Sequence, residues 1–245
     1  MNFKDVTICL LAAAMSAGAG CSSQRASAES PEALPFEMPA VPRPQIPARA
    51  VSIVDFGAVG DGHTLNTTAF AAAIDSLAAQ GGGRVTVPEG VWYTGPIVLK
   101  DHIELHLEQN ALIVFDNDPA HYPLVETTFE GLNTLRCQSP LSACGAKDVA
   151  ITGRGVIDGN GDAWRAVKRD KLTDREWKAK LASGGVLSDD GKTWYPSESY
   201  KFGATSGADQ NVSTWATTRE DFERMHDFLR PVMVSLHHCE NVLLE

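Results

Sequence analysis

Pairs of carboxylates are the residues through which this chain could act as a general acid and a general base. Four such pairs stand close together in the sequence: Asp116 with Asp118, Asp158 with Asp162, Asp189 with Asp190, and Glu104 with Glu108. The aspartates are flanked by Gly, Asn, Ser or Pro, a composition typical of turns. The glutamates alternate with leucines, which indicates the solvated side of a strand. We therefore assign no catalytic residue to these pairs.

A second group of side chains indicates binding rather than catalysis. Four of the five tryptophans fall between residues 162 and 228, a polar stretch with little strand pattern. From position 164 to 181 this stretch has seven Lys and Arg against three Asp and Glu, in a chain of net charge −10. Aromatic rings stack on sugar faces and Lys or Arg pairs with carboxylates, so an acidic polysaccharide fits both features.

We predict substrate contacts by Trp164, Trp177, Trp194 and Lys168. A second interpretation stays open for each tryptophan, because a large ring can simply pin this stretch to the rest of the fold.

The cysteines allow a disulfide but indicate no metal site. Cys137 and Cys144 flank the stretch QSPLSA, which permits a small loop disulfide in an oxidising compartment. No CxxC spacing occurs, and the adjacent residues His237, His238 and Cys239 would point to alternating faces of a strand. We interpret that trio as structural and expect no cofactor.

The N-terminus has the pattern of an export signal. Lys4 precedes an apolar run at 6–17, and the small residues AGAG lead to Cys21. The segment 1–21 is therefore predicted to be a signal peptide, with lipidation of Cys21 and plain secretion as the open alternatives, and a cytoplasmic helix as a third. The Pro-rich stretch 22–50 is predicted to be a tether. The protein would be periplasmic, outer-membrane-anchored or extracellular, and a lipid anchor would be its one membrane contact.

Short apolar strands separated by Gly, Asn and Asp corners fill most of residues 51–245. Strand patterns such as RVTV, IELHL, ALIVF and VAITG follow one another without crossover helices. Such strands bury an apolar side by stacking in parallel coils. We predict an all-β, right-handed parallel β-helix, with a helix at AFAAAIDSLAAQ capping its open end. The stretch 162–228 is an insertion, partly helical.

The stretch GAVGDG invites comparison with a phosphate-binding turn. Its glycines, Gly57, Gly60 and Gly62, have the order G-x-x-G-x-G, the reverse of the dinucleotide fingerprint. The helix that follows is not expected to begin at the last glycine, because its candidate caps, Asn66, Thr67 and Thr68, come several residues later. A dinucleotide enzyme is therefore disfavoured, and the net charge argues against a nucleic-acid partner.

Four stretches carry a family resemblance. They are VSIVDFGAVGDGHTLNTTAFAAAID, GGGRVTVPEGVWYTGPIVLKDHIELHLEQNALI, GRGVIDGNGDAW and LRPVMVSLHHCENVLLE. In this order they resemble the N-terminal region of glycoside hydrolase family 28, the polygalacturonase family of pectin-degrading enzymes. DFGAVGDG alone resembles several polysaccharide-active β-helix families, whereas the series is specific and covers nearly all of residues 51–245.

The resemblance implies inverting hydrolysis of galacturonan linkages in pectin, by carboxylates spaced to admit a water. The family's NTDG, GHG and RIK motifs are absent here, and Asp189-Asp190 lies in the insertion rather than at the place of the family's Asp-Asp pair. We therefore expect the N-terminal portion of an exported polygalacturonase-type glycosidase, truncated at its C-terminal end, with its catalytic half absent. The chain alone would be inactive, and the full-length enzyme a monomer acting on acidic plant polysaccharide.

Two other functions stay open. One is a non-catalytic surface β-helix that binds acidic polysaccharide through the insertion. The other is a pectin-active lyase that uses calcium and a basic residue.

Overall fold

The computed structural model describes residues 40–207, 213 and 215–245. The chain divides into two compact units, Met1–Val41 and Pro42–Glu245, and the second carries every element described below. The predicted signal peptide and Cys21 lie outside the described residues. Within the described ranges, every helix is too short or too polar to cross a bilayer.

The second unit begins within the segment predicted to be a tether. The backbone N–H of Gln45 donates a 2.9 Å hydrogen bond to the carboxylate of Asp148. Chain from Pro42 onward therefore packs on the fold ahead of the first strand.

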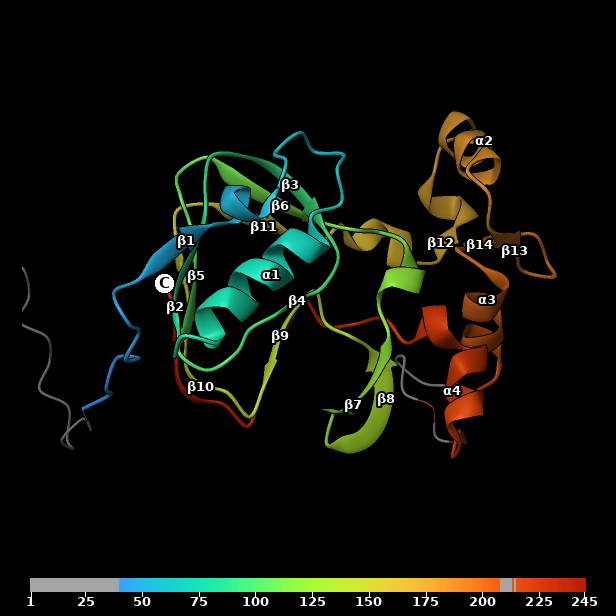
Figure 1. Ribbon diagram of the computed structural model, residues 1–245. Helices are drawn as coiled ribbons and strands as arrows, with labels where there is room; N and C mark the ends of the chain where they lie inside the picture. Colours follow the sequence, from blue (N-terminus) through green and yellow to red (C-terminus); the bar gives the residue numbers. More distant parts are fainter. Residues whose placement is uncertain (1–39, 208–212, 214) are drawn as a thin grey trace, which may run out of the picture. The chain divides into compact units, whose positions relative to one another are not determined.

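Three parallel sheets form the body of the fold (Figure 1). The largest contains, in spatial order, β1 (Ala50–Ser52), β2 (Gly83–Val87), β5 (Ile103–Leu107), β10 (Lys147–Gly153) and β16 (Glu240–Leu244). The second contains β11 (Val156–Asp158), β6 (Ala111–Phe115) and β3 (Gly90–Thr94). The third contains β15 (Val234–His237), β9 (Leu141–Cys144) and β4 (Ile97–Val98). Because the chain visits the three sheets in turn and pairs in parallel throughout them, the predicted parallel β-helix is confirmed.

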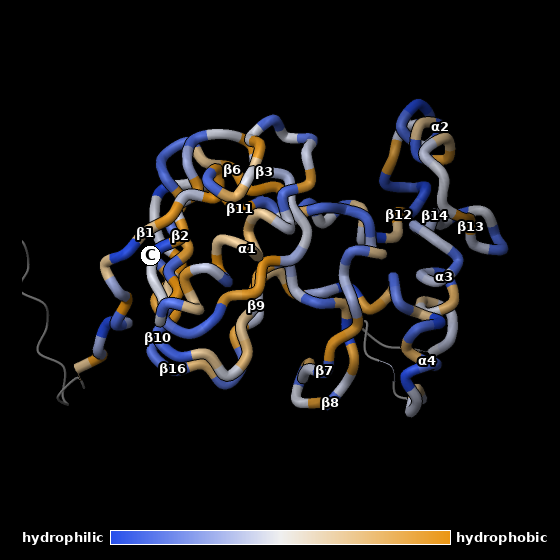
Figure 2. Tube along the Cα trace, in the orientation of Figure 1, coloured by the Kyte–Doolittle hydropathy of each residue, from blue (hydrophilic) through white to orange (hydrophobic). Residues whose placement is uncertain are grey.

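Aliphatic side chains fill the inside of the coils, in register from one coil to the next. Val85 lies opposite Leu105, and Leu105 lies opposite Ile151. Ile97 and Leu141 form the same kind of pair in the third sheet. These stacked side chains form the apolar core that no single short strand could bury alone. The trace in Figure 2 is coloured as hydrophobic along parts of these strands.

One corner of the coils has the same backbone conformation in four successive turns. The strand register aligns Gly82, His102, Asp148 and Asn241, and their φ angles are 105°, 56°, 54° and 53°. The Asp148 carboxylate is buried and accepts a 3.0 Å bond from the Asn241 amide, and it lies 3.2 Å from a ring nitrogen of His102. We call these four residues the corner column.

The predicted helix is present as α1 (Thr67–Ala78) and packs against the first coils. It buries Phe70, Ile74 and Leu77, which lie on one face at helical spacing. Asn66 is not a side-chain cap, contrary to the prediction. Its amide is buried and instead bonds the backbone of Val59, Thr64 and Tyr93, because the loop before the helix needs these bonds to close.

The strand predicted at 51–56 ends early. After β1 the chain turns into a 3-10 helix, η1 (Ile53–Phe56), because the side chains of Ser52 and Asp55 form a capping box that satisfies the backbone at its start.

Two segments leave the coils between strands. The first is an antiparallel hairpin of β7 (Leu124–Phe129) and β8 (Leu132–Cys137), preceded by η2 (Pro119–His121). The second is the insertion predicted at 162–228. It contains η3 (Gly161–Trp164), β12 (Val167–Lys168), η4 (Arg169–Lys171), α2 (Asp174–Ala182), β13 (Val186–Leu187), β14 (Thr193–Tyr195), α3 (Glu198–Thr205), α4 (Arg219–Arg224) and η5 (His226–Phe228).

The insertion is partly helical, and α2 begins at Asp174. Thr173 and Glu176 make the capping box that begins it, whereas Val167 and Lys168, earlier in the chain, pair with β14. The hairpin and the insertion share a second core. It contains Tyr122, Leu124, Cys137, Trp164, Tyr200, Phe222, Met225, Phe228 and Leu229.

The corner column predicts a strong effect at Gly82. A Cβ there would lie 2.4 Å from both the Cβ and the carbonyl oxygen of His102. We expect Gly82→Ala to lower the free energy of unfolding in urea by more than about 3 kcal/mol. The matched control is Gly145→Ala, where φ is 68° and nothing lies within 4 Å, so only backbone strain of about 1 kcal/mol is expected. Equal effects of the two variants would contradict the close stacking of this corner.

Candidate functional site

A cavity of about 230 Å³ lies between the third sheet and the hairpin. Its floor is a row of side chains in register, with Val98 of β4 and Ser235 of β15 on either side of Ser142 of β9. Alternate residues of these strands point into the core, so the floor residues face outward. We call this cavity, with these floor residues, the sheet groove.

The hairpin forms the wall of the sheet groove and contributes a cation to it. The guanidinium of Arg136 is buried, stacks 4.0 Å from the ring centre of Phe129 and donates to the backbone oxygen of Arg230. Burial, reinforced by the positive charge of Arg230, lowers the pKa of Arg136 to about 10, so the group stays charged at neutral pH. On the β15 side, Thr127 lies 3.3 Å from a ring nitrogen of His237.

This lining suits binding of an anionic, hydroxyl-rich molecule. Ser142, Ser235 and Thr127 supply hydroxyls, and Arg136 supplies a positive charge. Of the described residues that line the groove, Glu126 alone carries a carboxylate. Hydrolysis by a carboxylic acid and a carboxylate base requires two such groups, so the groove as described offers binding.

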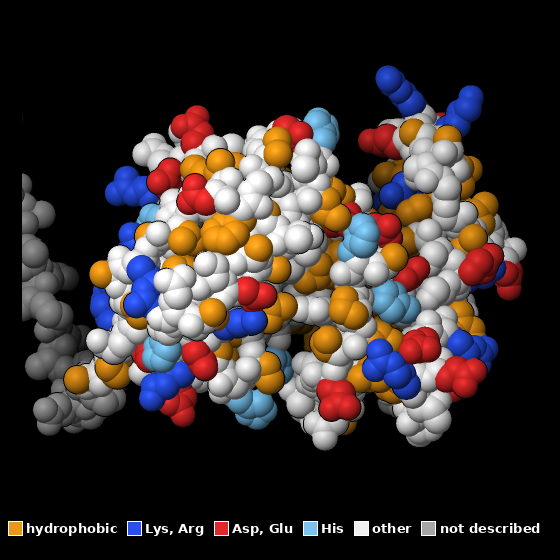
Figure 3. All heavy atoms as spheres, in the orientation of Figure 1, with side chains coloured by type: hydrophobic (Ala, Val, Ile, Leu, Met, Phe, Trp, Pro, Cys, Tyr) orange, Lys and Arg blue, Asp and Glu red, His pale blue; other side chains and the backbone are white. Residues whose placement is uncertain are grey.

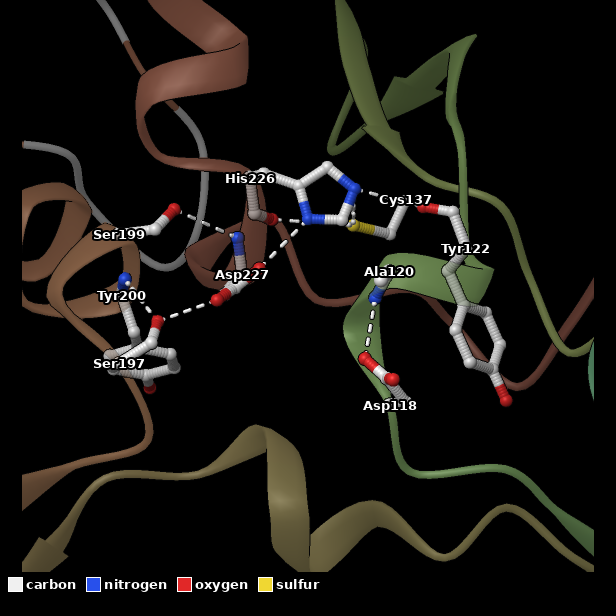
Figure 4. A network of polar contacts seen from close by, with 9 residues as sticks. All are labelled: Asp118, Ala120, Tyr122, Cys137, Ser197, Ser199, Tyr200, His226 and Asp227. Atoms are coloured by element: carbon white, nitrogen blue, oxygen red, sulfur yellow. Dashed lines mark hydrogen bonds and ion pairs between the residues drawn. The ribbon is translucent and has the colours of Figure 1, made fainter. Parts of the chain in front are cut away.

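A partly buried polar network joins the hairpin to the insertion (Figure 4). One ring nitrogen of His226 donates to Asp227 at 2.9 Å, and the other donates to the backbone oxygen of Tyr122 at 3.0 Å. Asp227 also accepts a 2.5 Å bond from the Ser197 hydroxyl, and the Cys137 sulfur lies 3.6 Å from the His226 ring.

This network holds an imidazolium. The hydrogen bond to Asp227 and then the contact with Cys137 raise the pKa of His226 to about 10. Burial by itself would raise the pKa of Asp227, but the bonds from His226 and Ser197 outweigh it and lower that pKa. The order Cys, His, Asp is that of a nucleophilic triad, yet both ring nitrogens are donors here, so His226 has no lone pair to act as a base. The network therefore links the hairpin to the insertion, and we call its residues Cys137, Ser197, His226 and Asp227 the strap.

The tryptophans predicted to contact substrate are mostly packed inside the insertion. Trp164 is buried edge-on against Tyr122, and Trp194 is buried with the Lys180 ammonium 3.9 Å from its ring centre. Trp177 is half-buried, with the Arg169 guanidinium 5.8 Å from its ring centre. The structure thus favours the second interpretation, in which Trp164 and Trp194 pin the insertion.

Lys168 is the one predicted contact that is fully exposed. It lies on β12 and lines a separate hollow with Arg169 and Lys192.

The disulfide permitted by the sequence is not formed. Cys137 and Cys144 are free thiols that both line the sheet groove. Cys137 is buried and its sulfur faces His226, whereas Cys144 is exposed at the end of β9, so the sulfur of Cys137 is directed at a different partner. No group of three or more His, Cys, Asp or Glu side chains within the described ranges is placed to hold a metal ion.

Most of the carboxylate pairs lie in turns, as predicted. Asp118 accepts from the backbone of Ala120, and Asp158 accepts from the backbone of Asn160. The prediction for Glu104 was wrong. That carboxylate is buried because the neighbouring strands place Arg84 at 2.8 Å and Thr152 at 2.6 Å from it.

The hairpin that walls the groove was missed in the sequence. Its signal is a pair of alternating runs, LVETTF and LNTLRC, separated by two residues, Glu130 and Gly131. Both turn residues have positive φ, which is typical of a type I′ hairpin turn. The spacing could have predicted the hairpin, although not the surface against which it folds.

No family model matches the chain. Over 126 residues it is 37% identical to a probable polygalacturonase of Vitis vinifera, a match that covers 48% of this chain and 26% of that protein. Over 154 residues it is 35% identical to an exo-poly-alpha-D-galacturonosidase of Dickeya chrysanthemi, covering 57% of this chain and 25% of that protein. The chain thus spans about a quarter of the length of these curated relatives.

A solved structure gives the same result. The crystal structure of a hyperthermoactive exopolygalacturonase from Thermotoga maritima superposes with a TM-score of 0.59 and 38% identity. The match covers 83% of this chain and 42% of that protein. The resemblance expected from the sequence is confirmed.

The strap predicts a stability that depends on pH. The pKa of His226 is raised on folding from about 6.5 to about 10, so its contribution is complete below pH 6.5 and disappears as the pH rises through 10. The lowered pKa of Asp227 means that its contribution is present above about pH 4 and is lost as the pH falls further. We expect His226→Gln to cost about 3 kcal/mol in urea unfolding between pH 4.5 and 6.5, and progressively less towards pH 10.

The matched control is His63→Gln, at an exposed histidine, which should leave the free energy of unfolding unchanged at every pH. A penalty for His226→Gln that is the same at pH 6 and pH 10 would show that the imidazolium charge does not stabilise the strap.

Proposed function

Because the chain is polygalacturonase-like, we propose that it belongs to a glycosidase that hydrolyses galacturonan linkages in pectin. Identity to polygalacturonases over about half of the chain supports this activity. The mechanism we propose is inverting acid–base catalysis by carboxylates. The family's NTDG, GHG and RIK motifs are not in this sequence, so we assign the acid and the base to no residue of this chain.

The role that we assign to the described coils is to bind the substrate in the sheet groove. The observation that carries this assignment is the in-register floor of Val98, Ser142 and Ser235 beside the buried cation of Arg136. A galacturonate unit presents one carboxylate and several hydroxyls. Charge-assisted bonds to the carboxylate and hydroxyl contacts along the floor would complement both.

Binding without cleavage is the second candidate function. The single carboxylate among the described lining residues of the groove favours it, because acid–base hydrolysis needs two.

Export completes the proposal. We infer a signal peptide at 1–21, with lipidation of Cys21 as the alternative to plain secretion. We also infer that α1 closes the end of the solenoid, supported by the apolar face that it packs on the first coils.

The groove assignment predicts that a large side chain on the floor blocks binding. We expect Ser235→Tyr to weaken binding of trigalacturonate in calorimetric titration by at least about tenfold. Thr86→Tyr is the matched control, at a half-buried position of β2 that lies outside the groove, and should bind as the unchanged chain does.

Release of reducing ends from polygalacturonate is measured on the same samples. We expect binding without release from this chain under both candidate functions, because neither the acid nor the base is assigned to it, and release would contradict the second candidate function. Unchanged binding by Ser235→Tyr would contradict the placement of substrate in the sheet groove.

A further inference from the structure

A second hollow, of about 510 Å³, lies on the insertion, on different elements from those of the sheet groove. Its lining is Lys168, Arg169, Asp170, Asp190, Lys192 and Thr193, and we call it the insertion hollow. The antiparallel pairing of β12 with β14 sets Lys168 opposite Thr193, and the backbone N–H of Arg169 donates to the backbone oxygen of Lys192 at 2.8 Å. Three cationic residues therefore meet where β12 ends and β14 begins.

The two lysines of this hollow lack carboxylate partners. Among the described residues, neither the Lys168 nor the Lys192 ammonium has a carboxylate oxygen within 4.0 Å. Asp190 is close in the chain, but its carboxylate accepts from the Ser188 hydroxyl at 2.6 Å and from the backbone N–H of Lys192 at 3.0 Å. That carboxylate holds the turn, which leaves the ammonium groups to solvent.

Of the other nearby carboxylates, Asp170 is exposed and lines the hollow without an ion pair among the described residues, whereas two more are used inside the insertion. Asp174 pairs with Arg169, and Glu176 bonds the backbone and hydroxyl of Thr173 at the start of α2. The basic side chains around them are exposed and have no ion pair within the described part of the chain. They are Arg165, Lys171, Arg175 and Lys178. Lys and Arg groups accordingly project from the surface over α2 (Figure 3). The hollow thus lies in a positive field, although the chain has a net charge of −10.

We propose that the insertion hollow is a second binding site, which takes a carboxylate-bearing segment of the acidic oligosaccharide through Lys168 and Lys192. The proposal rests on the proposed function for its substrate class and adds a site outside the groove. The hollow has the volume of an ordinary small-molecule site. The Thr193 hydroxyl adds a partner for a sugar hydroxyl, and the ammonium groups are the partners for carboxylates.

An oligosaccharide fits this hollow better than a nucleic acid. A nucleic acid presents continuous phosphates along its length and would meet the net negative charge of the chain beyond the insertion. A short uronate segment needs only the local positive charge. Of the contact residues, Lys168 was expected from the sequence and Lys192 was not, and no tryptophan is among the lining residues of the hollow.

The test is calorimetric titration of the full chain with trigalacturonate, maltotriose as the uncharged probe, and a short DNA duplex. We expect two binding events for trigalacturonate in the unchanged chain. The double variant Lys168→Ala/Lys192→Ala should lose one event, or weaken it at least about tenfold. The matched control, Lys171→Ala/Lys178→Ala, removes the same charge from exposed positions outside the hollow, and should change that event by less than about threefold. Lys168→Arg/Lys192→Arg should keep it.

The outcomes separate this inference from the groove assignment. Loss of all binding in Ser235→Tyr would overturn the second site and leave the groove in place. A binding event that survives Ser235→Tyr and disappears in the Lys168/Lys192 variant supports the second site, whether or not the sheet groove binds the ligand. Equal weakening of trigalacturonate binding by both lysine double variants would overturn the second site, because it would show that only the general positive charge of the insertion attracts the ligand. Equal binding of maltotriose, or tighter binding of the duplex, would overturn the ligand class.

Discussion

In-register stacking of parallel strands is the constraint on which the rest of this structure depends. Each strand is two to seven residues long and buries its apolar side only against the strands of the coils above and below. Stacking requires every coil to turn at the same place, and the corner column shows how this is achieved. The position of Gly82 is occupied in the next three coils by His102, Asp148 and Asn241, which also have positive φ angles. The buried Asp148 carboxylate accepts a hydrogen bond from the side chain of Asn241 and lies beside that of His102. Side chains that can bond locally offset the cost of that conformation.

A solenoid whose strands are fixed in this way can carry long segments that leave the coils at a corner. The hairpin and the insertion are two such excursions. The hairpin leaves between β6 and β9, and the insertion leaves between β11 and β15, while the strands on either side still pair in parallel. Both excursions pack on each other through a core of their own. The placement of the hairpin beside the third sheet turns an exposed sheet face into a groove with a wall. The groove is thus a product of two packed layers, and its charge comes from the hairpin.

The strap between the excursions illustrates how buried charge is accommodated here. His226 is held as a cation because Asp227, Ser197 and the backbone of Tyr122 satisfy its charge and its hydrogen bonds together. The insertion hollow is the opposite case. There Asp190 is committed to a turn and Glu176 to the start of α2, and the lysines remain available to a ligand. The insertion therefore contributes both to the contacts of the strap and to a surface charge.

The sequence by itself determined the parallel β-helix and the apolar helix α1, because apolar alternation, Gly and Asn corners and helical spacing are local patterns. It also placed most of the aspartates in turns. Only the tertiary structure decided that Glu104 is buried, that Trp164 and Trp194 pack inside, and that Cys137 faces His226 rather than Cys144. The same holds for the groove, whose floor and wall come from five strands, many of them far apart in the chain, and whose hairpin went unrecognised. Burial and partnership depend on which distant segments meet, and no local pattern carries that information.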